Sequence, residues 1–208
     1  YEVILKTFAD IRIAELCIPV IYGSTKIASY HRKALELPAV MFNQINNAGA
    51  AEVDKVNIVN CVTEEVKVEL GQPSKASGEA AFLSLEAALK DLQEGLIDVL
   101  VTAPINKDTI QREEFNFPGH TEYLEQKFSQ KGEKSLMILV KDSLRVALVT
   151  GHIPLGDVAK SVTKEKIQSA LRIFEKTLRR DFNIEKPRIA VLSLNPHAGE
   201  NGLLGTEE

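Results

Sequence analysis

Apolar residues recur along this chain at helical spacing in two long stretches. Over residues 77–94 the apolar side chains fall on one stripe, which predicts a helix capped by Ser77 and ended by Gly95. Residues 163–182 repeat the pattern and predict a second long helix, which covers one face of a sheet. The polar segment 71–78 predicts a loop.

Shorter apolar runs have the length of strands and alternate with helix-like stretches in the first half. The pattern predicts helices over 2–9 and 26–35 and strands over 17–22, 55–62, 97–102, 144–150 and 188–194. The last two runs read as buried strands. This alternation favours βαβ units, and therefore an α/β fold, over an all-α or all-β fold.

Two of the predicted strands lead into histidine motifs, GHIPL with His152 and NPHAGE with His197. A third strand ends at an APINK turn that carries Lys107. Open α/β sheets gather ligands outside the carboxyl ends of their strands, so these three side chains are candidates for one crevice. Two imidazoles there indicate a metal, although catalytic sites usually have three protein ligands. The alternative, histidines that bond to backbone in Gly/Pro turns, stays open.

A further motif, PGHTE, occupies residues 118–122. Thr121 is a suitable N-cap for a helix that would bury Leu124 and Phe128, and His120 precedes it in a glycine-led turn. Because a helix N-terminus favours an anion, His120 and Thr121 are candidates to hold a phosphate or carboxylate. Glutamates in the first turns already supply negative charge to this helix, so a purely structural cap is the alternative.

Composition narrows the class of protein. The 208 residues are 44% hydrophobic, and 25 basic against 29 acidic residues leave a formal charge of −4. No long basic run and no membrane-length apolar segment occurs, which argues against nucleic-acid and membrane partners. Cys17 and Cys61 lie in apolar runs without a CxxC motif, which favours buried thiols in a reducing compartment. We therefore expect a cytoplasmic protein.

Motifs of several other enzyme classes are missing from the sequence. The GSTK segment at 23–26 has its lysine after the hydroxyl pair, unlike a phosphate loop, and predicts a turn and a helix cap. The glycines of 199–205 lack GxGxxG spacing and are expected to permit tight backbone beside His197.

His31 is expected at the surface. The first residue is not methionine and the chain stops without a closing element, so we expect a piece of a longer protein.

Jointly, the motifs resemble a known family. They occur in the order found in the 4-hydroxythreonine-4-phosphate dehydrogenase family: APINK at 103–107, PGHTE at 118–122, TGHIPL at 150–155 and NPHAGE at 195–200. The resemblance covers the whole chain. It implies an isocitrate/isopropylmalate dehydrogenase-like, two-domain α/β/α architecture that is incomplete here, with parts of the two domains over 1–105 and 106–208.

The resemblance also implies a reaction of pyridoxal phosphate (vitamin B6) biosynthesis. It is the NAD-dependent oxidation of 4-phosphooxy-L-threonine to 2-amino-3-oxo-4-phosphooxybutanoate, which decarboxylates to 3-amino-2-oxopropyl phosphate. By motif match, His152 and His197 are ligands of a divalent metal and His120 and Thr121 hold the substrate. Zinc is the first candidate, with magnesium, manganese or cobalt as alternatives. Members are homodimers with the active site at the interface, where the partner subunit supplies a third histidine from beyond residue 208.

Lys107 and Asp157 are candidates for proton transfer or for contacts around the metal ligands, although a turn or cap role is favoured for Asp157. The motifs assign no residue that contacts NAD. Two other functions stay open. One is a related dehydrogenase that acts on threonate or erythronate 4-phosphate, and the other is a noncatalytic metal- or phosphate-binding α/β module, if the chain is complete.

Overall fold

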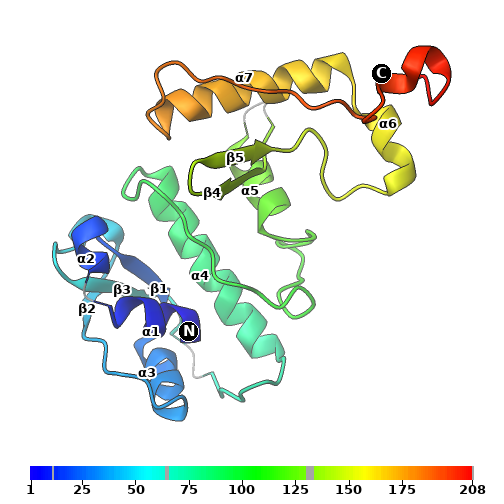
Figure 1. Cartoon of the computed structure of the whole chain (residues 1–208). Helices are drawn as coiled ribbons and strands as arrows, with labels where there is room; N and C mark the ends of the chain where they lie inside the picture. The colour runs from blue at the N-terminus through cyan, green and yellow to red at the C-terminus, as the bar shows by residue number, and fades with distance from the viewer. Residues whose placement is uncertain (11, 64–65, 130–133, 208) are drawn as a thin grey trace. The chain divides into compact units, whose positions relative to one another are not determined.

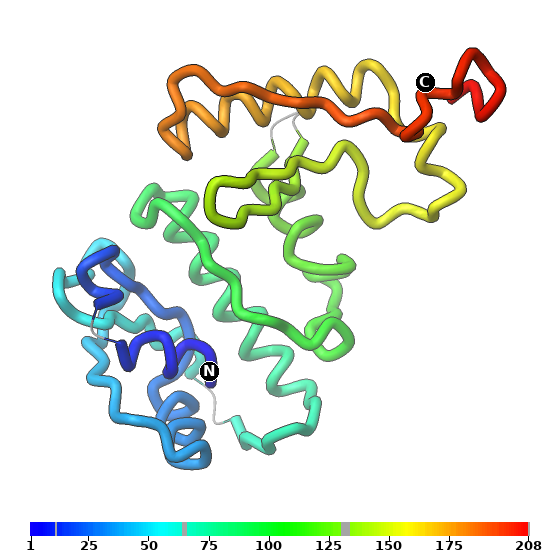
Figure 2. The backbone as a smooth tube through the Cα atoms, in the orientation of Figure 1, coloured from blue at the N-terminus to red at the C-terminus, as the bar shows by residue number. Residues whose placement is uncertain are grey.

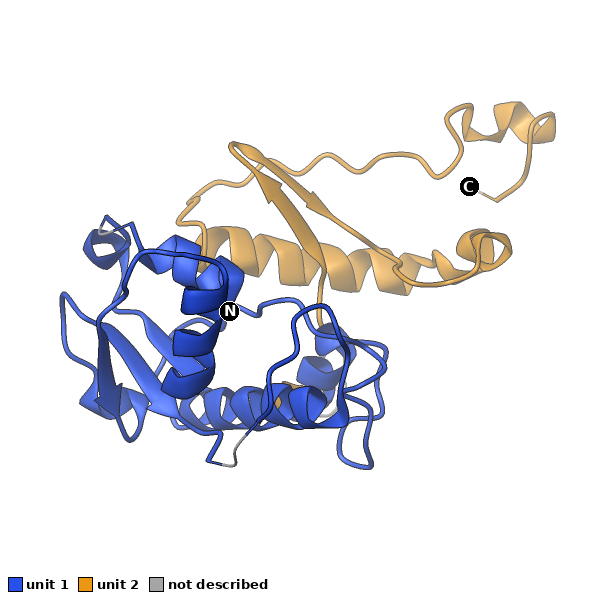
Figure 3. Cartoon of the chain, turned by 90° about the horizontal axis from the view of Figure 1, so that it is seen from below, with its two compact units in different colours: residues 1–127 blue, residues 128–208 orange. Residues whose placement is uncertain are grey.

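The computed structural model describes residues 1–10, 12–63, 66–129 and 134–207 (Figure 1). The chain forms two compact units, Tyr1–Lys127 and Phe128–Glu208 (Figure 3). The domain boundary predicted after residue 105 lies inside the first unit, because Ile110 and Phe115 are fully buried in that unit's core. The assignment of these regions to two dehydrogenase domains stays a prediction.

The first unit contains a three-stranded parallel sheet. Its strands lie in the order β1 (Val20–Gly23), β3 (Val56–Asn60) and β2 (Phe42–Ile45). Parallel neighbours cannot be joined by a tight turn, so α3 (Thr25–Ala34) carries the chain from β1 across β3 to β2. Ser24 caps α3 by accepting a hydrogen bond from the backbone of Ile27. The predicted βαβ arrangement and the predicted cap are confirmed.

The first unit also contains five shorter or longer helical segments among its described residues. They are α1 (Glu2–Phe8), α2 (Ile13–Leu16), the 3-10 turn η1 (Ala48–Ala50), α4 (Lys75–Gln93) and α5 (His120–Phe128). The helix predicted from Ser77 begins earlier, because Ser74 is the true N-cap. The two serines form a reciprocal capping box, with backbone-to-hydroxyl distances of 3.1 and 3.2 Å. The predicted loop over 71–78 therefore ends at Ser74.

An aromatic cluster anchors α4 and α5 to each other. The cluster contains Phe82 on α4, Phe115 in the segment before α5, and Tyr123 on α5. Their ring centroids lie 4.6 to 6.5 Å apart. The segment 97–102, by contrast, is not a strand, and Val99 and Val101 are 73% and 88% exposed. That prediction is wrong for the part of the chain that is described, because no described strand pairs with this segment.

Asp91 ties α4 to the sheet. Its Oδ2 accepts hydrogen bonds from the hydroxyl of Tyr22 at 2.7 Å and from the backbone N–H of Ala48 at 2.8 Å, and the side chain is buried. Burial, together with the bond to Asp91, raises the pKa of Tyr22, so this hydroxyl remains a donor. One carboxylate oxygen therefore satisfies donors from two distant segments.

We expect Asp91→Ala to destabilise the protein by about 3 kcal/mol, because two buried donors lose their acceptor. Asp91→Asn should recover most of that loss, since an amide oxygen can accept both bonds. Urea unfolding measures the difference, with the exposed Asp98 changed to alanine as the control. A loss of under about 1 kcal/mol in Asp91→Ala would mean that water replaces the carboxylate.

The second unit contains one hairpin and one long helix. β4 (Ile138–Lys141) and β5 (Leu144–Ala147) pair antiparallel, and η2 (Leu155–Asp157), α6 (Val158–Ser161), α7 (Lys164–Arg180) and η3 (Ala198–Gly202) follow. α7 confirms the helix predicted over 163–182. Thr163 is its N-cap and accepts a hydrogen bond from the backbone of Lys166. Phe174 and Leu178 are its buried residues.

The two buried strands predicted in this region are corrected by the structure. β5 covers only part of 144–150, and Leu144 is 63% exposed. Residues 188–194 form no strand, and Leu192 is 88% exposed (orange to red in Figure 2). A buried strand needs neighbours on both edges and cover on both faces, and the described residues of this unit provide neither for these runs.

Three smaller expectations are also tested. Cys17 is exposed in the link between α2 and β1, contrary to prediction, whereas Cys61 is half-buried, and both thiols are free. His31 is half-buried and stacks on Tyr1 with ring centroids 5.4 Å apart, so it is packed rather than solvated. Across the described residues, no helix is long and apolar enough to span a membrane.

Candidate functional site

The APINK motif forms a turn that is pressed against α4. The side-chain oxygen of Asn106 accepts hydrogen bonds from the backbone of Asp108 at 3.1 Å and of Thr109 at 3.0 Å. The turn approaches Gly78 so closely that a Cβ there would lie 1.9 Å from the carbonyl oxygen of Thr109. The backbone that carries Lys107 is therefore held by its own Asx turn and by contact with α4.

The PGHTE motif begins α5 with His120 as its first residue, so Thr121 lies inside the first turn and is not the predicted cap. Tyr123 is the buried residue of this helix, whereas Phe128 is 39% exposed. Tyr123 is preferred inside because its ring joins the aromatic cluster and its hydroxyl donates to Glu86 at 2.6 Å. Lys127 donates to the same carboxylate at 3.1 Å.

The role of Glu86 was not predicted from the sequence. Its partner Tyr123 lies 37 positions further along the chain, so no local pattern indicates the contact.

Lys107 reaches the N-terminus of α5. A Cβ built on Gly119 would lie 3.9 Å from Cε of Lys107 and 3.7 Å from a carboxylate oxygen of Glu122. The end of the Lys107 side chain therefore lies close to the positive end of a helix dipole, where His120 and Thr121 begin α5. This arrangement suits a phosphate or carboxylate, although Glu122 contributes a negative charge of its own.

Burial lowers the pKa of His120 below its ordinary value near 6.5. The unfolded chain therefore takes up a proton at this position at a higher pH than the folded protein does. Stability tied to neutral His120 is present above pH 6.5 and is lost as the pH falls through the lower folded pKa.

We expect the thermal midpoint of the wild type to fall more steeply below pH 6.5 than that of His120→Asn, which cannot titrate. Thermal scans from pH 8 to pH 5 make the comparison. The pKa of His31 is also lowered by burial, but His31 is common to both proteins and cancels. Parallel curves would contradict the burial of His120.

His152 lies between β5 and η2 and is exposed. Its φ of 53° is in the left-handed region, which non-glycine residues adopt at a cost of about 1 kcal/mol or more. Such strained positions are enriched at functional sites, and histidine is among the residues that tolerate them best.

His197 is held in a loop of unusual backbone. Its Nδ1 lies 3.0 Å from Oε1 of Glu200, and its backbone N–H donates to the side chain of Asn195 at 2.9 Å. Residues 198–202 all have positive φ, and a Cβ on Gly199 would lie 2.6 Å from the carbonyl oxygen of Gly205. The expectation that these glycines permit tight backbone beside His197 is confirmed.

The donor chemistry of these two histidines fits a divalent metal. A carboxylate beside Nδ1 of His197 favours the tautomer with its proton there, which leaves the Nε2 lone pair for a metal. Both side chains are exposed. Within the described ranges, however, no three His, Cys, Asp or Glu residues are grouped so that they could hold a metal ion. This chain can therefore contribute ligands but does not complete a three-ligand site among those residues.

Asp157 ends η2 and stands at the N-cap position of α6 without a capping hydrogen bond from its side chain. Its backbone N–H donates to the carbonyl oxygen of Pro154 at 3.0 Å. The local structure thus matches the turn alternative, without the side-chain bond that would make Asp157 a cap.

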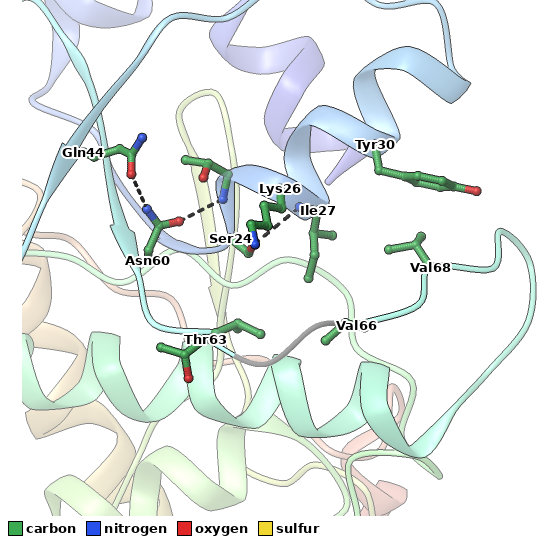
Figure 4. Close-up of a pocket in the computed structure, with 11 residues that line it drawn as sticks. Ser24, Lys26, Ile27, Tyr30, Gln44, Asn60, Thr63, Val66 and Val68 are labelled. Carbon is green, nitrogen blue, oxygen red and sulfur yellow. Dashed lines mark hydrogen bonds between the residues drawn. The ribbon is translucent and has the colours of Figure 1, made fainter.

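A separate pocket of about 450 Å³ lies at the carboxyl ends of β1 and β3 (Figure 4). Its polar side chains already serve the start of α3. Asn60 accepts from the backbone of Thr25 at 2.9 Å and donates to Gln44 at 2.7 Å. None of the predicted site residues lines this pocket.

Residues 15–208 match the family model of the pyridoxal phosphate biosynthetic protein PdxA. The chain belongs to the PdxA family. Relatives named 4-hydroxythreonine-4-phosphate dehydrogenase include one from Bacteroides thetaiotaomicron, 58% identical over 208 residues. Another, from a Sulfurihydrogenibium species, is 41% identical over 189 residues. The alignments cover 100% and 91% of this chain, but 57% of each relative.

Solved structures place the fold in the same family. The crystal structure of a 4-hydroxythreonine-4-phosphate dehydrogenase from Burkholderia phymatum matches with a TM-score of 0.82 at 31% identity, covering 99% of this chain and 62% of that one. The enzyme of the same name from Klebsiella pneumoniae matches with a TM-score of 0.76 at 27% identity, covering 89% and 56%. The α/β fold and the family resemblance inferred from the motifs are thus confirmed.

Proposed function

We propose that the protein containing this chain catalyses the NAD-dependent oxidation of 4-phosphooxy-L-threonine, followed by decarboxylation to 3-amino-2-oxopropyl phosphate. The observation that carries the proposal is the meeting of Lys107 with the N-terminus of α5 in a member of the PdxA family. His120 and Thr121, which lie at that N-terminus, would hold the anionic group of the substrate.

His152 and His197 would hold a divalent metal, with zinc as the first candidate and magnesium, manganese or cobalt as alternatives. When bound, NAD supplies hydride acceptance and the metal supplies charge stabilisation at the substrate's oxygens. Glu200 would keep the imidazole of His197 oriented for this purpose. Lys107 would attract the substrate's negative charge and keep it oriented. For Asp157 a role in the turn is favoured over proton transfer.

The same proposal includes an isocitrate/isopropylmalate dehydrogenase-like, two-domain architecture and a cytoplasmic homodimer with its active site at the interface. The pairing of two subunits is consistent with the two histidines of this chain, which need a further ligand.

The test is NADH formation by the complete gene product from 4-phosphooxy-L-threonine and NAD⁺, with and without a chelator. We expect metal-dependent turnover. Threonate and erythronate 4-phosphate are the comparison substrates, and a preference for either would reassign the protein to a related dehydrogenase that prefers a 2-hydroxy acid. No turnover on any of the three would favour a noncatalytic metal- or phosphate-binding module.

A further inference from the structure

Gln111 links the two segments that form the anion site. Its side-chain amide nitrogen donates to the carbonyl oxygen of Lys107 at 2.9 Å and to that of Phe117 at 2.9 Å. Phe117 stands two residues before Gly119, where the backbone turns into α5. One NH₂ group therefore uses its two hydrogens to join the turn that carries Lys107 to the entry of the helix that carries His120.

Other contacts also hold this loop, and Gln111 adds the hydrogen bonds that join its two ends. Ile110 and Phe115 are fully buried, and Arg112 and Phe115 exchange backbone hydrogen bonds of 3.2 Å in each direction. Arg112 also pairs with Glu79 on α4 at 2.7 Å. These contacts secure residues 110–115 against α4, and the ring of Phe117 packs on those of Phe115 and Tyr123. Gln111 adds direct hydrogen bonds to the backbone of Lys107 and Phe117, on either side of that stretch.

Gln111 is itself exposed, and both of its bonds are to backbone carbonyls at the surface. Bonds of this kind compete with water and add little to the stability of the whole unit. What they restrict is the position of Lys107 relative to the N-terminus of α5. The side chain of Lys107 is long and flexible, so its reach to Gly119 depends on where its backbone is held.

From this geometry we propose that Gln111 is a positioning residue, which sets the ammonium of Lys107 against the α5 N-terminus so that both engage the anionic group of the substrate. The inference rests on the proposed function, since it deepens the description of the same site. In this inference, Lys107 binds the substrate's negative charge equally in the ground state and in the transition state. Misplacing Lys107 should therefore raise KM and leave kcat nearly unchanged.

The test compares Gln111→Met, which keeps the length of the side chain and removes both donors, with Gln111→Glu, which also sets a carboxylate against two carbonyls. We expect KM for 4-phosphooxy-L-threonine to rise about tenfold in Gln111→Met and further in Gln111→Glu, with kcat within about twofold of wild type. Gln126→Met, on an exposed position of α5, is the matched control and should leave both constants unchanged.

A double-mutant cycle separates positioning from a general effect on the fold. If Gln111 acts through Lys107, adding Gln111→Met to Lys107→Met should raise KM by less than about twofold more. An effect of Gln111→Met that is fully retained without Lys107, an unchanged KM, or a lower kcat at unchanged KM would each overturn the inference while leaving the proposed function intact.

If the wild type does not oxidise the substrate, the proposed function fails and binding of inorganic phosphate, measured by calorimetry, decides the inference separately. Weaker binding in Gln111→Met than in wild type and in Gln126→Met would sustain it. Equal binding, or no phosphate binding by the wild type, would overturn it.

Discussion

Alanine in place of His197 or His152 is expected to lower turnover of 4-phosphooxy-L-threonine about a thousandfold, which corresponds to about 4 kcal/mol of lost transition-state stabilisation. Under the proposed function, each variant removes one of the two imidazoles of this chain that would hold the metal. Both side chains are exposed, so the fold should survive the change. Steady-state NADH formation and the metal content of the purified complete gene product are the two measurements.

The control for this experiment is His31→Gln in α3, a histidine that no family motif includes. It should keep wild-type turnover and metal content. A His197→Ala protein that retains both would show that the carboxylate beside Nδ1 only stabilises a turn. The alternative of loop histidines in Gly/Pro turns would then describe this motif.

Gly78→Ala is expected to destabilise the first unit by about 3 kcal/mol or more, the range of severe overpacking. The new Cβ would lie 1.9 Å from the carbonyl oxygen and 2.4 Å from the carbonyl carbon of Thr109, and 3.0 Å from the backbone nitrogen of Ile110. These are backbone atoms, and the buried side chain of Ile110 resists movement of the turn. Only a shift of α4 or of the turn relieves the clash.

Urea unfolding of wild type and variant measures this loss. Gly156→Ala is the matched control, because a Cβ on Gly156 meets no atom within 4 Å. A shift of α4 or of the turn at Thr109 would also displace Lys107 from α5. Any folded Gly78→Ala protein should therefore bind substrate more weakly. A variant as stable as the wild type would mean that the turn and α4 are less closely packed than the structure shows.

Helices were the part of the fold most open to prediction from sequence. Apolar spacing is encoded within a few neighbouring residues, as in the helix predicted over 163–182, which α7 confirms. Errors arose where two local signals were equally good. Ser77 and Ser74 are both capping residues, and they act together, with Ser74 outermost.

Strands were predicted less well, because pairing is decided by residues far apart in sequence. The runs at 55–62 and 97–102 have similar apolar character, yet only the first contains a strand with neighbours on both sides. An apolar run of this length can form a strand, but it does so only where another strand is placed to pair with it.

By itself, the sequence determined the family, the long helices and the histidine-bearing motifs, since these depend on residue type and order. Only the tertiary structure decided that Lys107 meets Gly119, that Tyr123 rather than Leu124 is fully buried, and that Gln111 joins the turn of Lys107 to the entry of α5. Such contacts depend on packing between elements, where a few tenths of an ångström decide which side chain fits, and no local pattern records that distance.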